Sequence, residues 1–282
     1  MLPTFELAHT PVPALGMGTW YLGEGNAAKS QQELQALRYG LDHGITVIDT
    51  AEMYGEGAAE TLVGQAIAPY DRHQLYLISK FYPWHATATQ MKKALEASLA
   101  RLGTDYLDLY LYHWRGNTPL AETLAGMAAL KKAGLIKAYG VSNFDVADLK
   151  EAAGLPGGHD IAANEVLYNL KARGIDYDLR AYQKQHDQSL IGYSPFNSGS
   201  GNTIVLPQVL QDLAKAKHIT THQLMLAWTW RHQDVLAIPK ASSIDHVQAN
   251  LDAMATIFTP DELAVIDSVF PKPTQHVPLA MI

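Results

Sequence analysis

Residues 44–55 read GITVIDTAEMYG, and the fold prediction rests on the pattern that this stretch sets. Its β-branched run Thr46–Ile48 has the composition of a buried strand, and the run ends in the polar Asp49. Helix-spaced segments stand on either side, Gln31–Asp42 before the run and Ala59–Ala68 after it. The stretch therefore predicts a short buried strand between two helices, with a carboxylate where the strand ends.

The same alternation recurs along the rest of the chain. The other predicted strands are Ala14–Gly18, which is the weakest, and Leu75–Ser79, Tyr106–Tyr112, Lys137–Val141, Ile161–Ala163, Leu190–Tyr193 and Val235–Ile238. The other predicted helices between strands are Ala88–Leu102, Leu120–Ala133 and Gln223–Arg231. Strands that alternate with helices predict a parallel sheet, and eight such strands fit the length of a (β/α)8 TIM barrel, an α/β fold.

Segments outside the alternation predict additions to this barrel. Thr4–Leu7 and Thr10–Pro13 have the composition of a small N-terminal β-hairpin, which we expect over the barrel bottom. After the last strand, Ser243–Ala255 and Pro260–Val269 have helical spacing, so a C-terminal extra helix is expected. A tail that contains proline, Pro271–Ile282, follows them.

Length and composition exclude several classes of protein. No low-complexity tract or long linker divides the 282 residues, so we expect a single domain over residues 1–282. The net charge of −7 argues against nucleic-acid and membrane partners. The absence of cysteine excludes disulfides, thiolate catalysis and cysteine-ligated metals. Neither a signal peptide nor a long apolar run is visible, so a cytoplasmic protein is expected.

Polar residues follow or end nearly all of the predicted strands. They are Asp49, Lys80, His113, Ser142-Asn143, Asn164-Glu165, Tyr193-Ser194 and Pro239-Lys240. The carboxyl ends of parallel strands meet at one face, which carries the active site in barrel enzymes. A single polar residue at a strand end is as well explained by capping. Seven chemically varied ends in succession predict a site.

Four of these side chains could act together on a carbonyl group. Asp49, Lys80 and His113 end three consecutive strands, and Tyr54 lies in the loop after Asp49. A phenol beside an ammonium has its pKa lowered towards neutrality, and a carboxylate can hold that ammonium charged. A histidine can orient the substrate oxygen or relay a proton. The set is suited to protonating a developing alkoxide, although a buried ion pair with a packed tyrosine and a capping histidine is the structural alternative.

The sequence motifs around these four residues help to decide between a catalytic set and a structural ion pair. They are Gly44–Gly55, Glu60, Gly64, Ser79-Lys80, Asp105–Trp114, Gly140–Phe144, Tyr193–Pro195 and Ile238–Lys240. In this order and at these separations, they resemble the aldo-keto reductase family over nearly the whole chain. Thr19–Tyr21, Glu52–Tyr54 and Tyr82–Trp84 resemble the bacterial branch of that family that includes methylglyoxal reductases.

The resemblance implies hydride transfer from NADPH to an aldehyde or ketone. Asp49, Tyr54, Lys80 and His113 match the family's catalytic tetrad. Tyr54 would donate the proton, Lys80 would lower the pKa of Tyr54, Asp49 would hold Lys80, and His113 would orient the carbonyl. The family's chemistry needs no metal, because the tyrosine takes the electrophilic role.

The resemblance also implies positions for the nicotinamide end of the cofactor. Ser142 and Asn143 match residues that hold the carboxamide, and Tyr193 matches the residue that stacks on the ring. Glu165 stands where the family usually has glutamine, and a carboxylate can accept from the carboxamide but cannot donate to it. Further cofactor contacts are expected from Thr19, Trp20, Asp49, Ser194 and Phe196. The small-residue loop Asn197–Thr203 would suit a segment that folds over the cofactor.

A second group of residues is expected at the adenosine 2′-phosphate. Lys240 is the main candidate, with Ser242, Ser243 and Asn250 nearby. His246 stands where many members have arginine, and Ala249 replaces a common glutamate. Histidine offers at most one contact and is neutral near pH 7, so a weaker preference for NADPH is expected.

Aromatic side chains are expected to form the substrate pocket. The candidates are Trp20, Met53, Trp84, Trp114 and the tail near His276–Ile282, with Tyr54 and His113 on the reacting carbonyl. Such walls favour small aldehydes and α-oxoaldehydes, methylglyoxal included. Two alternatives stay open, an NADPH-binding regulatory module with little turnover and a reductase of sugars or diketo acids. A monomer is expected, as is common in the family.

Overall fold

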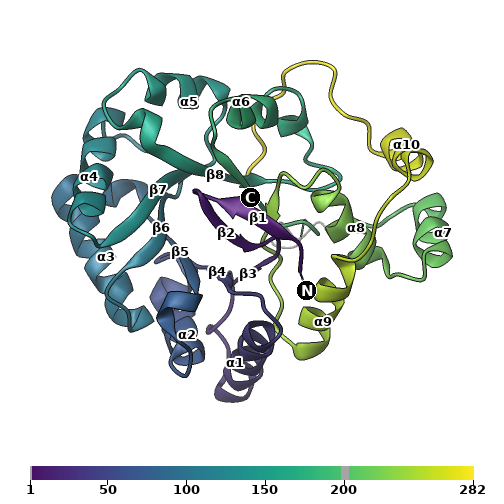
Figure 1. Ribbon diagram of the computed structural model, residues 1–282, viewed down its shortest axis with the longest axis horizontal. Helices are drawn as coiled ribbons and strands as arrows, with labels where there is room; N and C mark the ends of the chain where they lie inside the picture. The colour runs from purple at the N-terminus through teal and green to yellow at the C-terminus, as the bar shows by residue number, and fades with distance from the viewer. Residues whose placement is uncertain (1, 198–202) are drawn as a thin grey trace.

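The computed structural model describes residues 2–197 and 203–282, and its centre is a ring of parallel strands (Figure 1). In sequence order these strands are β3 (Gly16–Gly18), β4 (Val47–Asp49), β5 (Tyr76–Phe81), β6 (Leu107–Tyr112), β7 (Ile136–Ser142), β8 (Ile161–Leu167), β9 (Ser189–Tyr193) and β10 (Leu236–Ala237). Each strand pairs with its sequence neighbours. Parallel bridges from Leu15 to Ala237 and from Gly18 to Lys240 join the two ends of the sheet. The prediction of a TIM barrel is confirmed.

Helices surround the ring, as the outer layer in Figure 1 shows. They are α1 (Ala27–Asp42), α2 (Ala58–Ile67), α3 (Ala88–Leu102), α4 (Leu120–Lys132), α5 (Val146–Ala153), α6 (Leu179–Gln185), α7 (Gln208–Ala216), α8 (Thr221–Trp230), α9 (Ile244–Ala253) and α10 (Pro260–Val269). Short 3-10 turns are η1 (Tyr54–Gly57), η2 (Arg72–Gln74), η3 (Pro83–His85), η4 (Gly158–Asp160) and η5 (Gly174–Asp176). Thr259 starts α10 with a capping box, and Gly103 ends α3 with a left-handed φ of 66°, which glycine adopts easily.

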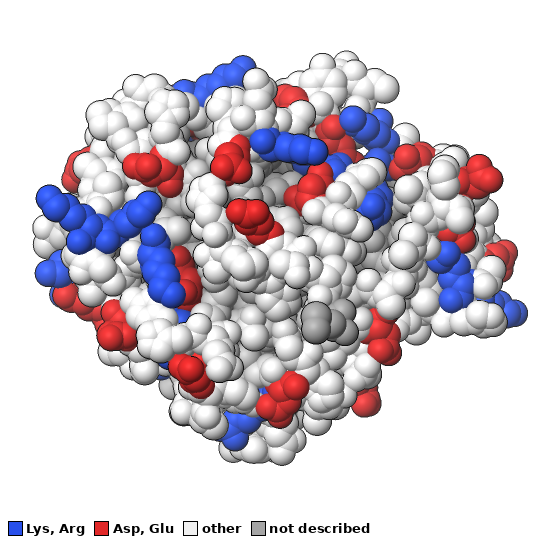
Figure 2. All heavy atoms as spheres, viewed as in Figure 1, with Lys and Arg blue, Asp and Glu red and all other residues white. Residues whose placement is uncertain are grey.

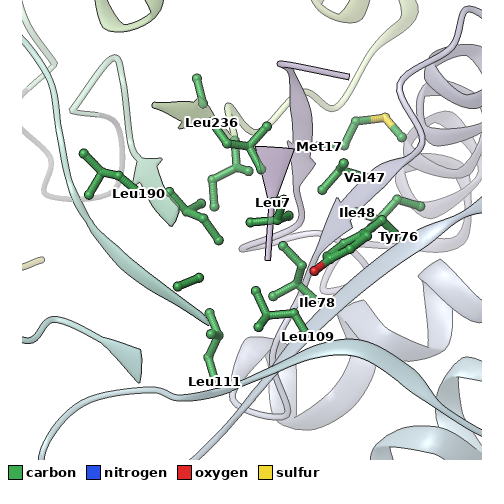
Figure 3. Packing of buried hydrophobic residues seen from close by; sticks show 14 of the residues in the cluster. Leu7, Met17, Val47, Ile48, Tyr76, Ile78, Leu109, Leu111, Leu190 and Leu236 are labelled. Atoms are coloured by element: carbon green, nitrogen blue, oxygen red, sulfur yellow. The ribbon is translucent and has the colours of Figure 1, made fainter. Parts of the chain in front are cut away.

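A hairpin closes one end of the barrel, as the sequence predicts. Its strands β1 (Thr4–Leu7) and β2 (Thr10–Pro13) pair antiparallel. Leu7 is fully buried, and Figure 3 shows it among apolar side chains of the surrounding strands, including Val47, Ile78, Leu109 and Leu236. Burying one such side chain stabilises a fold by about 1.5–3 kcal/mol. The hairpin end is therefore packed core, and the opposite end of the strands is left to carry the site.

Two predicted strands end later than expected. β5 runs past Ser79 to Phe81, so Lys80 lies inside that strand. β8 runs past Ala163 to Leu167, so Asn164 and Glu165 lie inside β8. Both stay extended because β8 pairs with β9 along this stretch, with Glu165 opposite Ile191. Since side chains alternate along a strand, they point to opposite sides. Asn164 bonds to the backbone of Phe144 and to Gln183, whereas Glu165 faces the barrel interior.

Figure 2 shows the face that carries the β1–β2 hairpin, with basic and acidic side chains interspersed. Within the described residues, none of the helices is long and apolar enough to cross a membrane.

Candidate active site

Lys80 is the centre of the polar cluster at the open end of the barrel. Its side chain is fully buried, and its Nζ donates to both carboxylate oxygens of Asp49 at 2.6 Å each. The same nitrogen lies 3.1 Å from the Thr50 carbonyl, 3.2 Å from the Tyr54 hydroxyl and 3.4 Å from Glu165 Oε1. Barrel closure thus brings side chains of β4, β5 and β8 onto one ammonium.

The turn after β4 places Tyr54 against Lys80. Tyr54 begins η1, and its backbone N–H donates to the Ala51 carbonyl at 3.1 Å. Gly55 and Glu56 follow with left-handed φ values of 58° and 53°. Such a conformation costs a residue other than glycine about 1–2 kcal/mol, so the position of Glu56 is held by the surrounding fold. This tight turn buries the phenol and aims its hydroxyl at Lys80.

His113 lies beside Tyr54 on the same wall. It follows β6 directly, and its backbone N–H donates to the Phe81 carbonyl at 3.2 Å. Its ring stands edge-on to the Tyr54 ring, with centroids 5.9 Å apart. Burial and then the positive charge of Lys80 hold the pKa of His113 well below its usual value. The imidazole is therefore neutral at physiological pH and has one N–H to donate to a substrate oxygen.

The direction of the Tyr54 pKa shift is opposite to the one predicted from pairing with Lys80. Burial raises the pKa of Tyr54 above its usual value, and the attraction of Lys80 offsets only part of this rise. Asp49 and Glu165 raise the pKa further, because their charges oppose a phenolate. Lys80 has its own pKa raised, chiefly by Asp49 and Glu165 against the cost of burial. The site thus holds a protonated phenol beside a charged ammonium.

These groups open onto a cavity of about 180 Å³. Of the predicted site residues, its wall contains Thr19, Trp20, Asp49, Met53, Tyr54, His113, Trp114, Ser142, Asn143, Glu165, Tyr193, Ser194, Phe196 and Lys240, and from the tail Met281 and Ile282. A larger hollow of about 650 Å³ lies between α9, α10 and the N-terminal segment, away from these side chains. The smaller cavity is the one with convergent polar groups.

A connected set of hydrogen bonds lines the cavity next to Glu165. The Ser142 hydroxyl donates to the Glu165 carbonyl at 2.9 Å, and the Asn143 amide donates to the His113 carbonyl at 3.2 Å. The Tyr193 hydroxyl donates to Asn143 Oδ1 at 2.9 Å. Glu165 Oε2 is buried and has no hydrogen-bond partner within the described part of the chain. An orphaned acceptor beside fixed amide and hydroxyl groups fits a ligand carboxamide.

The structure does not place every predicted residue at the cavity. Trp84, predicted to contact the substrate, is not among the residues of the cavity wall. Its ring stacks on Tyr82 with centroids 4.1 Å apart and stays 59% exposed. Arg115 is likewise outside, held by Asp148 and Glu151 at 2.7 Å.

The predicted phosphate residues lie around the N-terminus of α9. Lys240 is exposed and borders the cavity, whereas Ser242, Ser243, His246 and Asn250 lie beyond its wall. Ser243 caps α9 by accepting from the backbone N–H of His246 at 3.4 Å. In the loop Asn197–Thr203, residues 198–202 lie outside the described residues.

Sequence reasoning missed several residues of the site. Gly18, Tyr21, Pro195 and Ile238 complete the cavity wall. Burial lowers the pKa of Lys240, and α1 faces this lysine with Glu33, which raises the pKa, and Lys29, which lowers it. The position of Lys29 near Lys240 could have been predicted from the sequence, because closure of the barrel places the first helix next to the last strand.

Comparison with known proteins identifies relatives along the whole chain. The Aldo/keto reductase family profile matches residues 14–270. The methylglyoxal reductase YeaE of Escherichia coli is 44% identical over 273 residues, covering 96% of this chain and 95% of the relative. Crystal structures of a Klebsiella pneumoniae aldo-keto reductase, one with NADP and acetate and one with NADPH, are 46% identical and cover 100% of both chains at a TM-score of 0.95.

Proposed function

Since this chain belongs to the aldo/keto reductase family, we propose that it reduces small aldehydes and ketones, methylglyoxal included, to alcohols with NADPH. The observation that carries the proposal is the 3.2 Å approach of the Tyr54 hydroxyl to Lys80 Nζ in the wall of the cavity. A protonated phenol beside a buried ammonium is a general acid for an oxygen on which negative charge develops.

Each residue of the tetrad then has a role in the reduction. NADPH supplies the hydride. Tyr54 donates its proton to the carbonyl oxygen, and Lys80 stabilises the phenolate that remains. Asp49 keeps Lys80 in place through its two 2.6 Å contacts. His113, being neutral, donates its ring N–H to the carbonyl oxygen and orients it.

The residues of the cavity fit the cofactor in two groups. We assign Ser142, Asn143, Glu165 and Tyr193 to the nicotinamide end, supported by the orphaned Glu165 Oε2 and the hydrogen bonds around it. Thr19, Trp20, Asp49, Ser194 and Phe196 are assigned to the same ligand, since they line the cavity.

We assign the 2′-phosphate to the far end of the cavity, at Lys240 with Ser242, Ser243, His246 and Asn250 around it. Lys240 borders the cavity and Ser243 begins α9. A helix N-terminus with half-buried hydroxyls and a lysine beside it favours a phosphate. With His246 in place of arginine, the preference for NADPH over NADH is modest.

The cavity suits small uncharged carbonyl compounds. Trp20, Met53 and Trp114 supply apolar walls next to Tyr54 and His113. Within the described residues, no arginine lines the cavity, so nothing there forms a bidentate contact with a substrate carboxylate. This favours methylglyoxal and similar aldehydes over diketo acids, and the name of the Escherichia coli relative points the same way.

The complete buried tetrad favours turnover over a purely regulatory role. A module that only binds NADPH has no need of a general acid held by a buried ion pair. We further propose a cytoplasmic location, supported by the absence of a visible signal peptide, and a monomeric state, supported by the resemblance to the family.

The experiment that tests the function follows the absorbance of the reduced nicotinamide. Purified protein is mixed with NADPH or NADH and with methylglyoxal, benzaldehyde, a sugar aldehyde or a diketo acid. We expect loss of NADPH absorbance that is fastest with the small aldehydes. Binding of NADPH without loss for any carbonyl would contradict the reductase and support the regulatory module.

A further inference from the structure

Glu165 presents a second carboxylate to the ammonium that Asp49 already holds. Lys80 Nζ lies 2.6 Å from each Asp49 oxygen but 3.4 Å from Glu165 Oε1. All three side chains are buried, and Glu165 Oε2 has no partner in the described part of the chain. Asp49 is therefore the main ion-pair partner of Lys80, and Glu165 interacts with Lys80 more weakly.

The charges of this trio do not balance if both acids are ionised. One buried ammonium against two carboxylates leaves one negative charge without a partner, and a buried unpaired charge is avoided by taking up a proton. The closer contacts of Asp49 assign the charge to Asp49 and the proton to Glu165. Burial and the Asp49 charge raise the pKa of Glu165 well above its usual value, in the same direction.

The other groups around Glu165 do not supply a compensating charge. From β9, the pKa of Tyr193 is raised, chiefly by burial and then by Glu165 itself, so this phenol stays neutral. The pKa of Tyr54, in η1, is also raised, and His113, after β6, is neutral. From β7, Ser142 offers its hydroxyl to the Glu165 carbonyl and not to the carboxyl group. In the described part of the chain, Lys80 is the cation that acts on Glu165.

We propose that Glu165 carries a proton in the cofactor-free and NADPH-bound protein and releases it when NADP+ binds. This rests on the proposed function, which puts the nicotinamide ring against Glu165. The oxidised ring is cationic and the reduced ring is neutral. The oxidised ring alone supplies the second positive charge that a Glu165 carboxylate lacks, and in a buried site such an attraction is strong. A glutamine at this position could not release a proton when NADP+ binds, because its side-chain amide does not ionise.

The proposal gives a balanced path for the proton of the reduction. Tyr54 gives its proton to the carbonyl oxygen and is left as a phenolate. Lys80 passes a proton to that phenolate across 3.2 Å, and Glu165 passes its own to Lys80 across 3.4 Å. At the end Tyr54 and Lys80 have regained their protons, and Glu165 is a carboxylate beside the cationic ring.

Proton release on cofactor binding tests the proposal. Cofactor-free protein in a weakly buffered solution with a pH indicator is mixed with saturating NADP+ or NADPH. Since both carry the 2′-phosphate, its protonation affects the two traces alike. We expect NADP+ to release about one proton per site more than NADPH, and the Glu165→Gln variant to abolish this difference. Equal release with both cofactors, or an undiminished difference in the variant, would overturn the proposal.

A second measurement tests the proposal without the Glu165→Gln variant, in case thermal melting shows that this variant is poorly folded. The infrared spectrum of the wild-type protein should contain a protonated-carboxyl carbonyl band that disappears with NADP+ and persists with NADPH. A band that is absent from the start, or that survives NADP+, would contradict the proposal. Failure of either cofactor to bind would instead refute the proposed function, so the two failures are distinguishable.

Discussion

The Lys80 ammonium lies 3.2 Å from the Tyr54 hydroxyl, yet burial holds the pKa of that phenol above its usual value. Burial outweighs the attraction of the ammonium, and Asp49 and Glu165 add to the effect of burial. The acid of the proposed mechanism is thus kept in its protonated form.

The pH profile of the reduction follows from this direction. The reaction needs protonated Tyr54 and neutral His113, and the pKa of the first is raised while that of the second is lowered. As pH rises, Tyr54 keeps its proton beyond the usual range of a phenol. We therefore expect kcat/KM with NADPH and methylglyoxal to be flat from weakly acidic to weakly alkaline pH. A fall centred near neutrality would show a lowered Tyr54 pKa.

Lys240→Ala should separate the two reduced cofactors. A hydrogen bond to a charged group contributes about 1.5–3 kcal/mol, so the dissociation constant of NADPH should rise roughly ten- to a hundredfold. That of NADH, which lacks the phosphate, should stay within about twofold of the wild-type value on the same reasoning. Fluorescence titration measures both. Lys92→Ala, which removes an exposed lysine of α3, is the matched control. Equal losses for NADPH and NADH would place the phosphate elsewhere.

Two tryptophans test the position of the substrate pocket. Trp114 lines the cavity and Trp84 lies outside it, although their rings are in edge-on contact with centroids 6.1 Å apart. Trp114→Ala should raise KM for an aromatic aldehyde by about tenfold, because an apolar wall is lost. Trp84→Ala should leave this KM nearly unchanged. If Trp84→Ala raised this KM more than Trp114→Ala does, Trp84 would belong to the substrate site.

Leu7→Ala tests the role of the hairpin. Leu7 is fully buried at the closed end of the barrel, so the substitution leaves a cavity. We expect the free energy of unfolding to fall by about 2–5 kcal/mol, as measured by urea denaturation. Val205→Ala, at an 80% exposed position, serves as the control and should change little. A negligible effect of Leu7→Ala would mean that the hairpin is not part of the core.

Much of the site could be predicted because barrel topology turns sequence order into spatial order. Asp49 and Lys80 are 31 residues apart, and their convergence follows once they are placed near the carboxyl ends of adjacent parallel strands. The predictions of the family and of the fold are both confirmed. Both rested on motifs that stand at the ends of successive strands.

The remainder could not be predicted because it depends on packing. The short helices α5, α6 and α7, of eight, seven and nine residues, were not predicted, although the capping box of Asp145 and Asp148 marks the start of α5 and Leu210 and Ala214 share the buried face of α7. Trp84 follows β5 much as Trp114 follows β6, yet Trp84 lies in the turn η3 and only Trp114 is in the cavity wall, a difference that sequence position does not reveal. The sign of the Tyr54 pKa shift depends on burial and on Glu165, which a pairing argument omits.

Tyr54→Phe tests the central claim most directly. Single-turnover reduction of methylglyoxal is measured with saturating NADPH, and NADPH binding is measured in parallel by fluorescence. A general acid contributes typically 10²- to 10⁴-fold, so the rate should fall by about that factor. The NADPH dissociation constant should stay near the wild-type value, because the hydroxyl contacts Lys80 and not the assigned cofactor residues. A rate close to wild type would show that another group protonates the alkoxide and would contradict the account.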